Sequence, residues 1–262
     1  MQAIERLLPS DLLYKYQSLA TDDLVVRACK SISENYLYWA DPTGFNDPFD
    51  CQPAIVFEGS VRDRKAATKR TVNAVYSGKP RRERRQLVKT TGAVSRKSTI
   101  ETIKDNNKLE LSNSGVCCLL EHNDNILMWS HYGDNHSGLC LGFQISDQAI
   151  DFARASKVAY SEFRPVINLI HDLTEQNIFN ATMLTKSKQW SYESEWRMIE
   201  RNILKRERLY PPSALVQVIF GARIKPDDCS KILSAIEMSG ARPKLLKAEI
   251  DETRFKINLV EL

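Results

Sequence analysis

The apolar residues of this chain come in short runs, and this feature limits the folds that it can adopt. One of the longest runs, Ala214–Phe220, is interrupted by Gln217. It is far shorter than the roughly 20 apolar residues that a membrane-spanning helix needs. Runs of this length that are rich in Val, Ile and Leu are typical of buried β-strands. We therefore expect a globular protein with a central sheet and no association with a membrane.

The predicted strands and helices mix without the regular βαβ order of a parallel α/β fold. Strands are predicted over residues 12–18, 36–39, 115–120, 138–143, 158–160, 195–199 and 215–220, with one or two more in 245–260. Helices are predicted over residues 22–32, 60–107 with a break at 78–80, 126–132, 167–188 and 226–238. This mixture predicts an α+β fold with a curved, mainly antiparallel sheet flanked by helices. We expect one domain spanning residues 1–262.

Positive charge is concentrated in one segment. The formal net charge is only +4, but residues 60–105 hold 14 Lys or Arg against 4 Asp or Glu, whereas the rest of the chain holds 23 against 29. This predicts a basic helical insertion at 60–107 in a mildly acidic body. The segment is either a solvated helical face or a surface for nucleic acid or another polyanion. Its densest group is Arg81, Arg82, Arg84 and Arg85.

The six cysteines indicate a reducing compartment. None belongs to a C-x-x-C pair, and most have apolar neighbours, as in the segment 115–120. They are expected to be reduced, buried thiols. The first ten residues carry Glu5 and Arg6 and show no secretory signal. The expected location is the cytoplasm.

The loop Phe45–Asp50 is the first of three polar-aromatic segments. Its sequence, F-N-D-P-F-D, suits a turn in which Asn or Asp side chains hydrogen-bond the backbone. The alternative interpretation places Asn46 and Asp47 at the edge of a binding pocket.

The second segment, Met128–Gly138, contains two histidines five residues apart. Cys140 and the pair at 117–118 are close in sequence, but zinc sites usually have tighter local ligand pairs, and no metal is predicted. Trp129 and Tyr132 are expected to pack inward. His131 and Asn135 would then hydrogen-bond either to a tight turn or to a functional site.

The third segment, Trp190–Arg197, concentrates charge around a predicted strand. Side chains alternate along a strand, so Glu193, Glu195 and Arg197 would share one face and Trp196 would point the other way. Arg197 would hold a carboxylate ionised. The alternative is an exposed, ion-paired edge strand.

Together these segments resemble a bacterial family, the domain-of-unknown-function family numbered 2971. The shared motifs are L-Y-K-Y at residues 13–16, F-N-D-P-F at 45–49, W-S-H-Y at 129–132 and W-x-Y-E-x-E-W-R at 190–197. The resemblance covers most of the chain, but the name of the family implies no activity.

A more distant resemblance is to the ADP-ribosyltransferase fold, which implies NAD as a co-substrate. In that fold a basic or polar residue on a first strand, an aromatic motif and a late E-x-E follow in order. By this analogy Lys15 contacts the dinucleotide and Tyr38 stacks on nicotinamide. Glu195 or Glu193 binds the ribose and stabilises an oxocarbenium-like transition state.

The implied site draws on all of these segments. Its expected catalytic residues are Tyr38, His131, Glu193 and Glu195, and its expected cofactor-binding residues are Tyr14, Lys15, Asn46, Asp47, Tyr132 and Arg197. The usual His or Arg of the first motif is absent, and Tyr14, Lys15 and Tyr16 stand there instead.

Three functions remain open from the sequence. The first is an NAD-dependent ADP-ribosyltransferase-like toxin or defence effector, with nucleic acid or protein as acceptor and with an antitoxin or defence partner. The second is a nuclease that uses His131, Glu193, Glu195 and Arg197. The third is a non-catalytic module that binds nucleic acid or protein through its basic helices.

Overall fold

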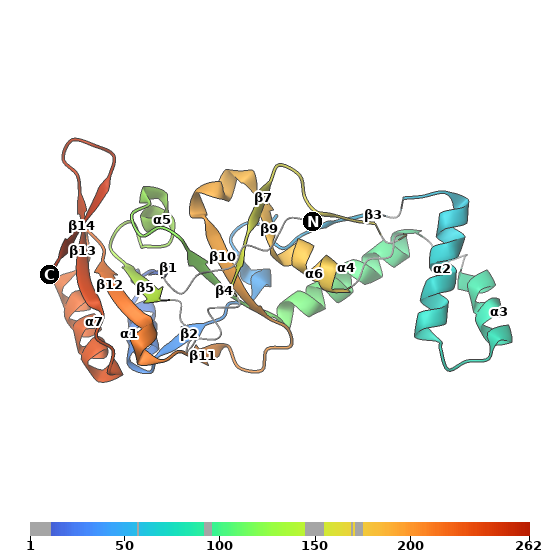
Figure 1. Cartoon of the computed structure of the whole chain (residues 1–262), viewed down its shortest axis with the longest axis horizontal. Coiled ribbons are helices and arrows are strands. Elements are labelled where there is room, and N and C mark those ends of the chain that lie inside the picture. Colours follow the sequence, from blue (N-terminus) through green and yellow to red (C-terminus); the bar gives the residue numbers. More distant parts are fainter. Residues whose placement is uncertain (1–11, 57, 92–95, 145–154, 169, 171–174) are drawn as a thin grey trace. The chain divides into compact units, whose positions relative to one another are not determined.

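The computed structural model describes residues 12–56, 58–91, 96–144, 155–168, 170 and 175–262. The chain divides into two compact units (Figure 1). The first unit comprises Met1–Asp41, Ser114–Ala159 and Lys188–Leu262, and the second comprises Pro42–Asn113 and Tyr160–Ser187. The first ten residues, in which the sequence indicates no secretory signal, lie outside the residues that the structure describes.

The first unit is built on an eight-stranded sheet with the order β14-β13-β12-β5-β1-β4-β10-β6. Its strands are β1 (Leu12–Gln17), β4 (Gly115–Leu120), β5 (Leu139–Gln144), β6 (Ser156–Lys157), β10 (Glu195–Glu200), β12 (Leu215–Phe220), β13 (Lys244–Ile250) and β14 (Ile257–Glu261). Neighbouring strands are antiparallel except β12 and β13, which are parallel. The α+β fold with a mainly antiparallel sheet is confirmed.

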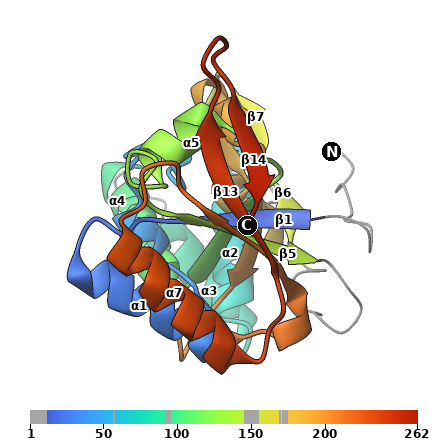
Figure 2. The same ribbon diagram turned by 90° about the vertical axis from the view of Figure 1, so that its left-hand side faces the viewer.

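Helices α1 (Asp22–Ser33) and α7 (Pro226–Ser239) pack side by side (Figure 2). Thr21 caps α1 as predicted, because its hydroxyl oxygen accepts a hydrogen bond from the backbone amide of Leu24 at 3.3 Å. The buried side chains of α1 and α7 join one hydrophobic cluster with Leu13 and Leu141 of the sheet. One face of the sheet is therefore the main core.

The opposite face of the sheet carries a second cluster. Tyr14 and Tyr16 of β1 pack there with Met128 and Trp129 of α5 (Ile126–His131). A small two-stranded sheet pairs β2 (Tyr36–Tyr38) with β11 (Glu207–Leu209). The 3-10 turns η3 (Lys188–Glu193) and η4 (Pro212–Ala214) precede β10 and β12.

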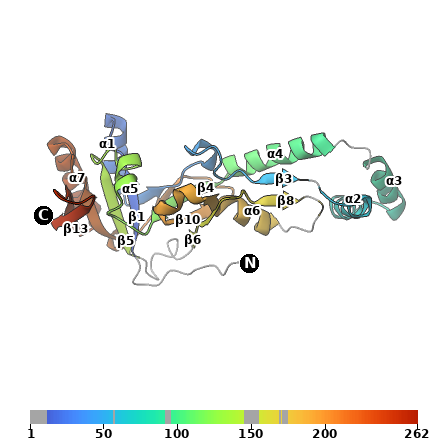
Figure 3. The same cartoon turned by 90° about the horizontal axis from the view of Figure 1, so that it is seen from above.

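The second unit is mainly helical (Figure 3). Its helices are α2 (Val61–Val75), α3 (Arg81–Thr91), α4 (Arg96–Ser112) and α6 (Glu175–Met183), with the 3-10 turn η1 (Pro42–Gly44). Its short strands are β3 (Ala54–Val56), which pairs in parallel with β8 (Val166–Asn168), and β7 (Ala159–Ser161), which pairs with β9 (Thr185–Ser187). Ser60 starts α2 with a reciprocal capping box to Asp63.

The predicted helix over 167–188 is wrong. Residues 166–168 form β8, only 175–183 are helical as α6, and 185–187 form β9, while 169 and 171–174 lie outside the described residues. Val166 and Ile167 are β-branched residues that suit a strand. They form one by pairing with β3, which lies about 110 residues earlier in the chain. Local apolar spacing carries no information about that partner.

None of the described helices is long and apolar enough to span a membrane. All six cysteines are free thiols, and Cys51, Cys117 and Cys140 are buried. The expectation of reduced cysteines therefore agrees with the structure.

Candidate functional site

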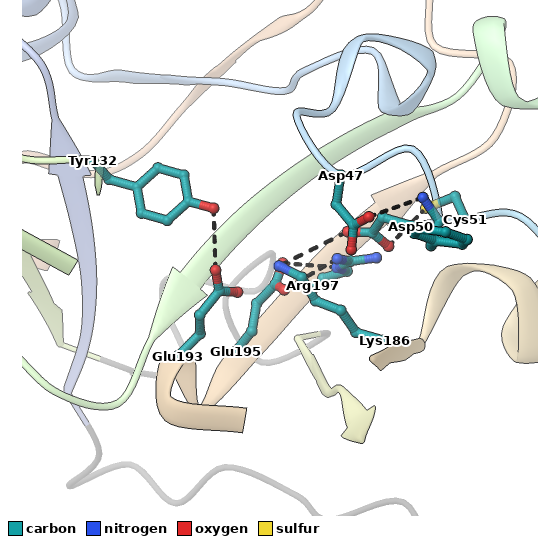
Figure 4. A network of polar contacts seen from close by, with 9 residues as sticks. Asp47, Asp50, Cys51, Tyr132, Lys186, Glu193, Glu195 and Arg197 are labelled. Atoms are coloured by element: carbon teal, nitrogen blue, oxygen red, sulfur yellow. Dashed lines mark hydrogen bonds and ion pairs between the residues drawn. The ribbon is translucent and has the colours of Figure 1, made fainter. Parts of the chain in front are cut away.

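The strand β10 begins with a buried ion pair. Arg197 Nε donates to Glu195 Oε1 at 2.7 Å and its terminal nitrogen donates to Oε2 at 3.0 Å (Figure 4). The Arg197 and Glu195 side chains are 0% and 2% exposed. They share a face because they are two residues apart in a strand, as predicted. The alternative of an exposed edge strand is wrong, since β10 lies between β4 and β6.

Glu193 lies outside this strand. It is the last residue of η3, and Ser194, with a φ of 46°, turns the chain before β10 begins at Glu195. The strand alternation that was expected to align all three charged residues therefore applies only to Glu195 and Arg197. The conformation of Ser194 directs Glu193 toward a different partner.

That partner is Tyr132, which follows α5. The Tyr132 hydroxyl donates to Glu193 Oε1 at 3.1 Å (Figure 4). Asn125 holds the two segments together, since its side chain caps α5 and also donates to the carbonyl of Tyr192 at 2.8 Å. The W-S-H-Y and W-x-Y-E-x-E-W-R motifs thus meet at one hydrogen-bonded carboxylate.

A chain of aromatic ring contacts begins at Tyr132. The His131 ring lies edge-on to Trp190, with centroids 6.3 Å apart, and edge-on to Tyr132 at 6.4 Å. Trp190 also lies 5.9 Å from Tyr192. His131 is exposed, whereas Glu193 is buried. The ring of Tyr132 therefore links an accessible imidazole to a buried carboxylate. We call these residues, with Tyr132, the Glu193 cluster.

The turn after α5 has an unusual backbone. Asp134, Asn135 and His136 all have positive φ angles of 51°, 51° and 71°. Asn, Asp and His tolerate this region better than other residues with side chains. The turn stacks the His136 ring on Trp129 and brings its Nε2 within 3.2 Å of Ser130 Oγ. Burial, together with the charge of Arg223, lowers the pKa of His136 below its ordinary value.

This turn and its neighbours show no metal-site geometry. Within the described residues, no group of three or more His, Cys, Asp or Glu side chains is arranged to hold a metal ion. His136 is instead occupied by the ring and hydroxyl contacts of the turn.

Cys118 faces the buried ion pair but is a poor candidate nucleophile. It stands opposite Arg197 in the register of β4 and β10. Burial raises the pKa of its thiol well above the ordinary value, and the Glu195 carboxylate raises it further. The thiol therefore stays protonated at neutral pH, which disfavours nucleophilic chemistry.

Tyr14 and Lys15, which were both expected to bind the cofactor, lie on opposite faces of the sheet. Tyr14 stands opposite Leu120, which in turn stands opposite Glu195, so Tyr14 and Glu195 lie on the same face. Lys15 is the next residue of β1 and lies on the other face. Its ammonium donates to the carbonyl oxygen of Cys118 at 3.0 Å.

Tyr14 is largely enclosed on its face of the sheet. Gly142 lies opposite it, and a Cβ at Gly142 would come within 3.0 Å of the tyrosine ring, so the glycine makes room for it. Burial and the nearby Cys140 raise the pKa of the Tyr14 hydroxyl. Tyr14 is therefore a packed, protonated phenol.

Tyr38 lies at the end of β2, where its side chain is 41% exposed. It stands opposite Glu207 of β11, and the guanidinium of Arg27 lies 5.9 Å from the centre of its ring. A cation above the ring is a cation–π contact, which holds the tyrosine against α1.

The F-N-D-P-F-D loop belongs to the second unit. Asp47 Oδ1 accepts the amide of Phe49 at 2.9 Å, so the predicted turn with a side-chain hydrogen bond is present. Asp47 is buried and Asn46 is exposed. The loop also ends in a pair that the sequence did not suggest, since the buried Lys186 lies 3.8 Å from Asp50 (Figure 4). Nothing in the local sequence around Lys186 indicates this pairing.

The four predicted nucleic-acid-binding arginines lie on α3. Arg81, Arg82 and Arg85 are exposed and Arg84 is half-buried. With 100° of rotation per residue, Arg81, Arg82, Arg85 and Lys89 fall within an arc of about 100° on one side of the helix. Helices α2 and α3 pack against each other. We call residues 61–91 the basic hairpin.

With this geometry in place, comparison with known proteins gives one result. Residues 128–198 match a family described as Protein of unknown function (DUF2971). The matched segment runs from α5 into β10 and contains both partners of the Tyr132–Glu193 contact, and it supports the resemblance drawn from the sequence motifs. No curated protein and no solved structure matches this chain.

Proposed function

We propose that the protein binds nucleic acid through the basic hairpin. The observation that carries this proposal is the charge of residues 61–91, which include 11 Lys or Arg and only 2 Asp or Glu. Most of these cations are exposed. Among the described side chains of the hairpin, only Ala67 and Val72 are buried. A segment with so little apolar surface gains little from packing, so its charge is available for an anionic partner.

The spacing of the cations suits a phosphate backbone. Arg81, Arg85 and Lys89 follow one another at intervals of four residues, and Arg62, Lys65 and Lys69 form a similar row on α2. Eight residues of helix rise about 12 Å, which corresponds to three to four base-pair steps of a duplex. Guanidinium groups bind phosphate oxygens through paired hydrogen bonds. Contacts of this kind confer affinity without sequence preference.

The test is the salt dependence of binding. Anisotropy titrations with a labelled 20-nucleotide single strand and the matching duplex would compare wild type with the variant Arg81→Gln, Arg82→Gln, Arg84→Gln, Arg85→Gln. Each lost phosphate contact lowers the slope of log K against log salt by about 0.9 on duplex and about 0.7 on single strand. We expect the slope to fall by about 3 and the affinity at low salt to fall at least tenfold.

A matched control separates this surface from net charge. The exposed residues Lys30, Lys225, Arg242 and Lys256 of the first unit would be changed to Gln together. This variant removes the same charge and is expected to keep the wild-type slope. Equal losses in both variants, or a wild type that does not bind, would reject the hairpin as the binding surface.

A second candidate function is NAD-dependent chemistry at the Glu193 cluster. The specific observation that favours it is the convergence of two motifs at the Tyr132–Glu193 hydrogen bond, with His131 in contact with the rings of both Tyr132 and Trp190. A carboxylate beside developing positive charge stabilises an oxocarbenium-like transition state, and an indole offers a stacking surface for a planar ring. Such an activity would suit the toxin or defence role that the resemblance implies.

The geometry favours Glu193 over Glu195 for this role. Both oxygens of Glu195 accept hydrogen bonds from Arg197, so that carboxylate is already neutralised. The same pairing disfavours a nuclease in which Arg197 binds phosphate. Lys15, on the opposite face of the sheet, would not reach a dinucleotide held at Glu193.

Release of nicotinamide from NAD, measured by chromatography, tests this candidate. Glu193→Gln is expected to abolish release, and Tyr132→Phe to reduce it, while both variants keep the circular dichroism spectrum of the wild type. Full release by Glu193→Gln would remove this residue from the mechanism.

A further inference from the structure

The second unit contains a cavity of about 510 Å³. This volume lies within the range of roughly 300–1,000 Å³ that is usual for small-molecule sites. The cavity is formed by α4, by β3 with the residues just before it, by Thr43 of η1, and by Arg164, which precedes β8. Contacts of α4 with η1 and with β3 hold these walls together.

The charged lining of the cavity is mostly basic. Lys104 and Lys108 are four residues apart on α4, so they lie one turn apart on the same side of the helix. Arg164 adds a third cation from a segment distant in sequence, and Asp105 is the acidic residue among the lining side chains. The lining thus carries a net charge of two positive units, which favours an anionic ligand.

Arg164 is held in place at the cavity wall. Its Nε donates to the carbonyl oxygen of Gln52 at 2.7 Å, and its guanidinium lies 5.9 Å from the centre of the Phe49 ring. A guanidinium carries four further N–H donors in a rigid planar fork. An arginine fixed through Nε is prepared to bind the oxygens of a phosphate without losing further side-chain freedom.

The rest of the lining is chemically different. Pro53, Ala54 and Ile55 supply apolar surface, while Thr43 and Asn107 supply hydrogen-bonding groups. A ligand that fits both parts has a phosphate at one end and a flat or apolar body at the other. Nucleotides have this combination, and their hydroxyl or amino groups could donate to Asp105.

We propose that this cavity binds a nucleoside monophosphate, with its phosphate on Lys104, Lys108 and Arg164 and its base or sugar against Pro53 and Ile55. The ligand is either a free nucleotide or the phosphorylated terminal nucleotide of a nucleic acid. The proposal rests on residues of the cavity and on none of the arginines of the basic hairpin. It therefore stands or fails separately from the nucleic-acid binding proposed above.

Isothermal titration calorimetry of the full chain with AMP tests the proposal. We expect saturable binding, and adenosine, which lacks the phosphate, should bind at least about tenfold more weakly. The double variant Lys104→Gln, Lys108→Gln should weaken AMP binding by at least about tenfold, since it removes two charge-assisted contacts. Both lysines are exposed, so the variant is expected to fold normally.

The matched control is Lys65→Gln, Lys69→Gln. These two lysines are also exposed, also four residues apart on a helix of the second unit, and do not line the cavity. This variant should change AMP binding less than about twofold. The hairpin variant at 81–85 should likewise leave AMP binding intact, which separates the two proposals.

Two further titrations identify the source of the nucleotide. An eight-nucleotide RNA with a 5′-phosphate would compete with AMP if the site takes a terminal nucleotide, and the same RNA without the phosphate would not. Competition by neither RNA, with AMP still bound, would assign a free nucleotide. Absence of saturable AMP binding, equal binding of adenosine, or equal losses in the two lysine variants would overturn the proposal.

Discussion

The strand β10 and the basic hairpin use charge in opposite ways. In β10, Glu195 and Arg197 are buried and hold each other through two hydrogen bonds. In the hairpin, 10 of the 11 Lys and Arg residues are exposed, with only two acidic residues in the same segment. A buried pair is costly to disrupt and acts on folding, whereas exposed like charges contribute little to folding and remain available to a partner.

Breaking the buried pair should have the largest effect on stability. Glu195→Ala removes the carboxylate that accepts two hydrogen bonds from the buried Arg197, which costs about 3–5 kcal/mol of unfolding free energy. All four tryptophans lie in the first unit, so urea unfolding followed by tryptophan fluorescence reports on this part of the molecule.

Glu237→Ala is the control, because Glu237 is exposed on α7 of the same unit. It should cost less than about 0.5 kcal/mol. The double variant Glu195→Leu, Arg197→Met should recover much of the loss, since an apolar pair of similar volume needs no charge compensation. If Glu195→Ala were as stable as the control, the pair would not be desolvated.

A half-buried pair at the edge of this sheet, between β6 and the residue that follows β4, should give an intermediate effect. Glu121 Oε1 accepts a hydrogen bond from Trp196 Nε1 at 2.8 Å and lies 2.9 Å from Lys157 Nζ. The Glu121 and Lys157 side chains are 30% and 34% exposed. Glu121→Gln should cost about 1 kcal/mol at pH 7 in the same unfolding measurement.

This intermediate effect should depend on pH. Burial alone would raise the pKa of Glu121, but the hydrogen bonds from Trp196 and Lys157 and the lysine charge outweigh it and lower the pKa below its ordinary value of 4.5. A lowered carboxyl pKa stabilises the fold above the ordinary value, and the contribution is lost as the pH falls through the pKa of the folded state. The difference between wild type and Glu121→Gln should therefore shrink below about pH 4.5. A difference that persists unchanged at pH 3 would contradict the charged contact.

The exposed pair at the start of α3 in the hairpin should give the smallest effect. Lys79 and Glu83 lie 3.3 Å apart, with side chains 49% and 56% exposed. Lys79→Gln should change the thermal unfolding of the helices, followed by circular dichroism at 222 nm, by no more than about 0.5 kcal/mol. A loss comparable to that of Glu195→Ala would show that hairpin charges act on folding, and would weaken the contrast between the two regions.

Much of the fold could be predicted from the sequence because its signals are local. The alternating aromatics of β1, the caps at Thr21 and Ser60, and the apolar run of β12 each depend on neighbouring residues only. The strands β3 and β8 escaped prediction because each depends on the other, across about 110 residues.

The site was predictable in part for the same reason. Strand alternation correctly placed Glu195 and Arg197 together, but the left-handed Ser194 removed Glu193 from that face. No local pattern predicted the contact of Glu193 with Tyr132, 61 residues away, or the cavity lined by Lys104 and Arg164. Such features depend on strand register and chain reversal, which composition and spacing do not encode.

The position of β1 has a consequence for biosynthesis. This strand lies in the interior of the sheet between β4 and β5, which the ribosome adds to the chain about 100 and about 125 residues after it. At roughly 5–20 residues per second, its backbone edges stay unpaired for several seconds. During that interval the nascent chain presents the aromatic L-Y-K-Y strand as a target for chaperones and for aggregation.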